Sequence, residues 1–100
     1  MQKRYKVKWT LSAENDFDLI TDYLLENWSD SVLQKFIEIT EASIQQIIRF
    51  PTLFPIIYKK ERVRKCVLTK QNTLYYKIKD SEIQILRIFD TRLNPSKLQF

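Results

Sequence analysis

The chain has 100 residues, which is enough for one domain covering residues 1–100 and too few for two. It contains no histidine and no glycine, which excludes a Ser–His–Asp triad, a histidine-ligated metal site, a P-loop and a glycine-rich dinucleotide loop. Its single cysteine, Cys66, allows neither an internal disulfide nor a zinc knuckle and is typical of a protein from a reducing cytoplasm.

The net charge of +5 is unevenly distributed along the chain. Residues 1–10 carry +4, residues 11–50 carry −6 and residues 51–100 carry +7. If the two basic ends meet in one sheet, the molecule has a positive and a negative side, and the positive side attracts phosphate backbones or an acidic protein. The alternative is a surface charge that only keeps the protein in solution. Residues 1–10 contain no apolar signal-peptide core, and no apolar run is long enough to span a membrane.

The first element is predicted to be a strand over residues 4–10, where Tyr5, Val7 and Trp9 alternate with polar side chains. A helix is expected next, to about Asn27, with Ser12 as its N-cap. Its apolar residues recur at helical spacing at Ala13, Phe17, Ile20 and Leu24.

A second helix of nearly twenty residues is predicted to begin at a cap provided by Ser29 or Asp30 and to end before Pro51. The short turn between the two helices predicts an antiparallel helical hairpin. Residues 52–57 form an apolar segment that contains Pro55, and we expect a loop there.

Three further strands are predicted over residues 62–70, 73–79 and 82–90, separated by tight turns. The order β-α-α-β-β-β predicts an α+β fold, in which a four-stranded antiparallel sheet carries the helical hairpin on one face. Both strand faces carry apolar residues, so the pattern alone leaves the covered face open. Packing favours an inner set of Val63, Val67, Leu74, Tyr76, Ile83 and Ile85.

This order of elements, together with four motifs, resembles the RelE/ParE superfamily of toxins from type II toxin–antitoxin systems. The motifs are the first helix at residues 13–24, the proline-containing loop at 50–55, the strand pair at 63–67 and 75–78, and the closing segment at 85–95 with its Arg-x-x-Pro ending. The likeness extends over roughly residues 5–97. Each motif is weak alone, but their order and spacing together are fairly specific.

The resemblance implies a growth-inhibiting cytoplasmic toxin held in check by a cognate antitoxin, whose C-terminal arm wraps around it. RelE-like members cleave mRNA on the ribosome without a metal, whereas ParE-like members poison DNA gyrase and cut nothing themselves. We expect no cofactor, no metal and no membrane partner. If the protein is an enzyme, it is a metal-independent endoribonuclease. A third possibility, from a different class, is a nucleic-acid-binding module without toxicity.

The resemblance also points to candidate site residues. Arg64, Arg87 and Arg92 stand where the family has cations that would stabilise a phosphorane-like transition state. Each could instead form a structural ion pair. Lys65, Lys70, Tyr75 and Lys77 are the candidate residues for binding nucleic acid or the target. The histidine and the C-terminal tyrosine of RelE-like nucleases are missing, and Asp90 or Thr91 stands near the position of that histidine, which favours a ParE-like activity.

Overall fold

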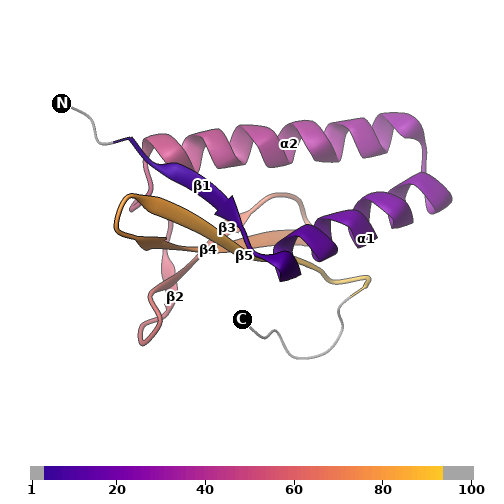
Figure 1. The fold of residues 1–100 in the computed structure, drawn as a ribbon. Coiled ribbons are helices and arrows are strands. Elements are labelled where there is room, and N and C mark those ends of the chain that lie inside the picture. The colour runs from indigo at the N-terminus through magenta and orange to yellow at the C-terminus, as the bar shows by residue number, and fades with distance from the viewer. Residues whose placement is uncertain (1–3, 94–100) are drawn as a thin grey trace.

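The helices and strands follow one another in the predicted order, with one additional strand. The computed structural model describes residues 4–93, so the Arg-x-x-Pro ending lies partly outside the described residues. The elements are β1 (Lys6–Trp9), α1 (Leu11–Asn27), α2 (Asp30–Arg49), β2 (Ile56–Tyr58), β3 (Val63–Val67), β4 (Asn72–Lys79) and β5 (Glu82–Asp90). Figure 1 shows the two helices joined by a short turn, with α2 passing over one side of the sheet.

Both helices begin at a hydroxyl side chain that accepts a hydrogen bond from the first turn. In α1 this residue is Thr10, whose Oγ1 accepts from the backbone N–H of Ala13 at 3.1 Å. The prediction of Ser12 as the N-cap is therefore wrong, because Thr10 also donates to the carbonyl of Leu86 at 2.9 Å and so fixes the start of the helix against the sheet. Of the two predicted caps of α2, Ser29 is the one that caps the helix, which ends at Arg49, before Pro51.

The sheet has five strands in the order β1-β5-β4-β3-β2 and is mixed, so the prediction of four antiparallel strands is corrected in two respects. First, β1 pairs with β5 in parallel, from Lys6 opposite Glu82 to Trp9 opposite Ile85. Alternating apolar residues define a strand's faces but carry no information on its direction. Second, residues 56–58, predicted as part of a loop, form the edge strand β2, whose three exposed residues show no alternation.

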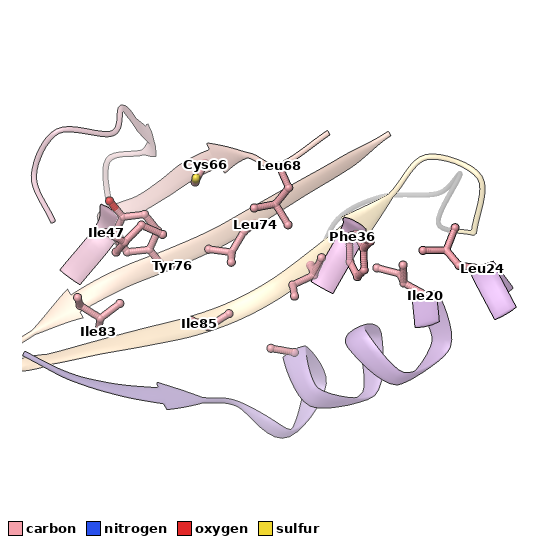
Figure 2. Close-up of a cluster of buried hydrophobic side chains, with 12 residues drawn as sticks. Ile20, Leu24, Phe36, Ile47, Cys66, Leu68, Leu74, Tyr76, Ile83 and Ile85 are labelled. Atoms are coloured by element: carbon pink, nitrogen blue, oxygen red, sulfur yellow. The ribbon is translucent and has the colours of Figure 1, made fainter. Parts of the chain in front are cut away.

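The core lies between the helices and one face of β3, β4 and β5. Leu74, Tyr76, Ile83 and Ile85 are buried there as predicted, together with residues of both helices (Figure 2). Val67 was predicted inside and is 60% exposed. Cys66 pairs with Leu74 on the inner face, so the next residue along β3 must face outward. Val63 is buried, but it lies outside this cluster.

A β-bulge in β5 changes which residues point inward. Tyr75 of β4 lies opposite Arg87, but the next residue, Tyr76, lies opposite Ile85, so Leu86 is the additional residue. As a result Ile85 and Ile88 are both buried, although residues three positions apart in a regular strand lie on opposite faces. This shift in phase places Asp90 on the buried side of the strand, where it is fully inaccessible to solvent.

Candidate functional site

Arg64 holds the loop that follows α2. It lies on the inner face of β3 and is only 9% exposed. Its Nη1 donates to the carbonyl oxygen of Thr52 at 3.1 Å and to that of Phe54 at 2.6 Å. Tyr76 assists from the neighbouring strand, because its hydroxyl donates to the carbonyl of Pro51 at 2.7 Å. Burial raises the pKa of Tyr76 to about 12, despite the opposing effect of the Arg64 charge.

Arg87 joins β5 to α1 through a bidentate ion pair with Asp16. The Nε and Nη2 atoms of Arg87 lie 2.6 and 2.9 Å from the two carboxylate oxygens of Asp16. The same carboxylate accepts the backbone N–H of Ile88 at 3.0 Å, so it also satisfies a donor at the bulged part of β5. The hydrogen bond to Asp16 raises the pKa of Arg87, with burial acting in the opposite direction. The pair fixes the orientation of α1 relative to the sheet.

Arg92 belongs to a polar network centred on the buried carboxylate of Asp90. Its Nε and Nη2 donate to the two oxygens of Asp90 at 3.1 and 2.8 Å, and Asn72 donates to the same group at 2.6 Å. The Arg92 guanidinium also lies 5.0 Å from the centre of the Tyr23 ring. Burial raises the pKa of Asp90, but the hydrogen bonds from Arg92 and Asn72 outweigh it, so the pKa is lowered.

The three candidate arginines are therefore each held by a different partner. Arg64 binds backbone carbonyls of a loop, Arg87 binds Asp16 of α1, and Arg92 binds Asp90 at the end of its own strand. None of these contacts joins one of the arginines to another. Asp90, which the sequence placed near the position of the family's histidine, has both carboxylate oxygens engaged by donors.

Three of the four candidate binding residues share one side of the sheet. Lys65 of β3 stands opposite Tyr75 of β4, which in turn stands opposite Arg87 of β5. Lys77 is two residues from Tyr75 and lies on the same side of β4. We call this side of the sheet, defined by Lys65, Tyr75 and Lys77, the open face. Lys70 is exposed and belongs to the turn between β3 and β4.

Asp16 was not among the predicted site residues, although the sequence carries a signal for it. Asp16 lies between Ala13 and Ile20 on the buried stripe of α1, and a carboxylate at such a position needs a charged or hydrogen-bonding partner. Within residues 4–93, no cluster of three or more metal-ligating side chains of the His, Cys, Asp or Glu type is found. In the same part of the chain, neither helix combines the length and the apolar character needed to cross a membrane.

Solved structures with a similar fold include toxins and complexes of toxin–antitoxin systems. A chain from the structure of the chromosomal ParDE toxin–antitoxin system of P. aeruginosa matches with a TM-score of 0.74 and 22% identity, over 89% of this chain and 98% of that one. A YoeB/ParE toxin from Agrobacterium tumefaciens matches with a TM-score of 0.62 and 14% identity, over 85% and 96% of the two chains. The RelBE2 toxin–antitoxin complex from Mycobacterium tuberculosis gives a TM-score of 0.59 and 19% identity, over 87% and 98%.

The sequence itself narrows this class to one family. Residues 7–95 match the family model of the ParE toxin of the type II toxin–antitoxin system parDE, so the chain belongs to the ParE toxin family. Among curated proteins, no sequence matches the chain. The prediction of a RelE/ParE superfamily toxin is confirmed.

Proposed function

We propose that the protein inhibits growth by binding and poisoning DNA gyrase, without cutting nucleic acid itself. The observation that carries this proposal is that each candidate catalytic arginine already has acceptors within the fold. Membership of the ParE family supports the same target, since ParE-like toxins poison gyrase.

The chemistry of RNA cleavage explains why these contacts favour binding over catalysis. A nuclease of this type needs a base to remove the 2′-proton and cations aimed at the phosphate in the transition state. To meet a phosphate with the N–H donors that they now use, Arg87 and Arg92 would have to leave Asp16 and Asp90, and each departure would leave a buried carboxylate without its cation. The chain also has no histidine that could serve as the base.

A cognate antitoxin is the second partner that we propose, and the cytoplasm is the compartment. The matching structures from P. aeruginosa and M. tuberculosis are toxin–antitoxin systems, which supports an antitoxin for this chain. The lysines of the open face would attract an acidic antitoxin arm or an acidic surface of the target.

In the deciding experiment, the purified protein is incubated with gyrase, supercoiled plasmid and ATP. Detergent and protease are then added to release any cleaved plasmid from gyrase. We expect linear plasmid to accumulate with the dose of protein, while a reporter mRNA in a translating extract stays intact. Replacement of both Lys65 and Lys77 by glutamate should weaken this effect. Replacement of Lys59 and Lys60, which are exposed in the turn between β2 and β3, makes the same charge change and serves as the control.

A ribosome-dependent endoribonuclease is the second candidate, favoured by the position of Tyr75 near Lys65 and Lys77 on the open face. An aromatic ring between two cations on an open sheet suits a single RNA strand, because the ring can stack on a base. Intact plasmid together with a cleaved reporter mRNA would decide for this candidate and against gyrase.

A further inference from the structure

A cavity of about 240 Å³ lies where the two helices meet the turn between β3 and β4. Leu24 near the end of α1 and Phe36 in the first half of α2 form part of its wall, and both belong to the core cluster. Figure 2 shows these two side chains with Ile20 at the end of the core where the chain leaves β5. The opposite wall contains Asn72, at the start of β4.

The size and the floor of this cavity suit one apolar side chain. Sites for cofactors and drug-sized ligands usually measure about 300–1,000 Å³, so this cavity is smaller than most of them. Four aliphatic or aromatic residues line it, and two of these, Val32 and Ile39, keep part of their surface accessible to solvent. Ordered water is held by two or more polar partners, so this largely apolar floor favours an apolar guest.

The rim of the cavity is positively charged. Lys35 and Arg92 are among the lining residues, and none of the lining residues is a carboxylate. The charge of Arg92 is balanced by Asp90, so the net positive charge of the rim comes from Lys35. Within residues 4–93, Lys35 takes part in neither of the two ion pairs. Lys70 adds a further exposed cation in the adjoining turn. The charge at the rim therefore favours an anionic guest segment.

The wall of the cavity is held in place before any guest arrives. Asn72 is only 2% exposed, and its side chain donates to Asp90 while it accepts from the hydroxyl of Thr69 at 2.7 Å. Asp90 also holds Arg92, so one buried carboxylate fixes two of the lining residues. A site whose wall is already ordered requires less loss of conformational freedom when a partner binds.

We propose that this cavity is an anchor site for one apolar side chain carried by an acidic segment of a protein partner. The inference rests on the proposed function, in which that partner is the antitoxin, and it adds the place and the chemistry of the contact. The apolar side chain enters between Val32 and Ile39, and the flanking carboxylates lie near Lys35 and Lys70. The cavity lies between the two helices and the turn that joins β3 to β4. An arm anchored there leaves the open face available for separate contacts.

The test adds short capped synthetic peptides to the full chain labelled with ¹⁵N. NMR spectra record the amide signals of the protein as each peptide is added. The first peptide has one leucine flanked by glutamates, the second has serine in place of the leucine, and the third has lysines in place of the glutamates. We expect the first peptide to shift the amide signals of residues 32–39 and 69–72 in particular. The serine peptide and the lysine peptide should each bind at least about tenfold more weakly.

Two variants and one control assign the binding to the cavity. Lys35→Glu reverses the charge of the rim and should weaken binding of the first peptide about tenfold. Val32→Trp places a ring over the cavity and should block the same peptide. Lys59→Glu makes the same charge change in the turn after β2 and should leave binding unchanged. ¹⁵N spectra of all three variants report whether they remain folded.

Several results would overturn the proposal. These are no binding at millimolar peptide, shifts confined to the open face, or equal losses in Lys35→Glu and Lys59→Glu. Gyrase is absent from this assay, so it can fail independently of the proposed target. If the protein does not bind the first peptide but gyrase still cleaves plasmid in its presence, the anchor site alone is rejected. If the peptide binds but no plasmid is cleaved, gyrase alone is rejected as the target.

Discussion

The sheet carries its cations in two regions that differ in how many acceptors the fold supplies. At the border with the helices and the loop after α2, Arg64, Arg87 and Arg92 each have two or more acceptors. On the open face, Lys65 and Lys77 lie beside Tyr75 and project from the sheet on the side away from the core. A guanidinium presents several donors in a fixed fork, which suits the first region, whereas an ammonium is strongly hydrated and suits the second. The arginines are thus held within the fold, and we propose that the lysines engage partners.

The largest effect that would test this comparison is expected from Asp16→Ala. The change leaves Arg87 without its ion-pair partner and the N–H of Ile88 without its acceptor. Breaking a buried pair by removal of one partner costs about 3 kcal/mol, which urea unfolding would measure as a lower midpoint. The control is Asp18→Ala, an exposed position on the same helix, where the change should stay within about 0.5 kcal/mol. Equal losses at both positions would mean that the border region does not depend on this pair.

The second effect is expected from Arg64→Ala, at about 2 kcal/mol, because hydrogen bonds from a charged group are stronger than neutral ones. The carbonyls of Thr52 and Phe54 would lose their donor, so the loop should also become more sensitive to proteases. Lys65→Ala, the next residue on the opposite side of β3, is the matched control and should change stability little. If the two variants unfolded at the same urea concentration, the distinction between the regions would be lost.

The third effect depends on pH and comes from Asp90. Its pKa is lowered in the folded protein, so its charged form stabilises the fold above the ordinary range of an aspartate near pH 4. This contribution is lost as the pH falls through the lower, folded-state pKa. Asp90→Asn should therefore be less stable than the natural chain at pH 7 and should lose less stability between pH 5 and pH 2. Asp22→Asn, at an exposed position of α1, should keep the acid dependence of the natural chain. Identical acid dependence in Asp90→Asn would show that the Asp90 pair does not contribute.

The helices and four of the five strands were predicted from local signals, whereas the short edge strand β2 was not. The stripe of Ile20 and Leu24 in α1 and the cap at Ser29 were sufficient to place both helices. The direction of β1 was missed because it is decided by pairing with β5, more than seventy residues later in the chain. The bulge at Leu86 was missed for a similar reason, since it is visible only in the register between β4 and β5.

The roles of the arginines needed the structure for a different reason. Arg87 and Asp16 are separated by 71 residues, and nothing local in the sequence connects them. The Arg92–Asp90 pair is local, but the burial of Asp90 depends on the shift in phase that the bulge introduces. An arginine is thus ambiguous in a sequence until its acceptors are known. The face of Lys65 was ambiguous as well, because Lys65 lies two residues from both Val63 and Val67, which were predicted to lie inside.

The smallest effect on stability, and the most direct test of the open face, is expected from the pair Lys65→Ala and Lys77→Ala. Neither lysine takes part in the two ion pairs found within residues 4–93, so unfolding should shift by less than about 0.5 kcal/mol. If gyrase is engaged through this face, plasmid cleavage should need more of the double variant, and the difference should shrink as salt rises, because the lost attraction is electrostatic. Unchanged cleavage at low salt would move the contact with gyrase away from the open face. A large loss of stability would instead place these lysines with the arginines, as groups that the fold itself requires.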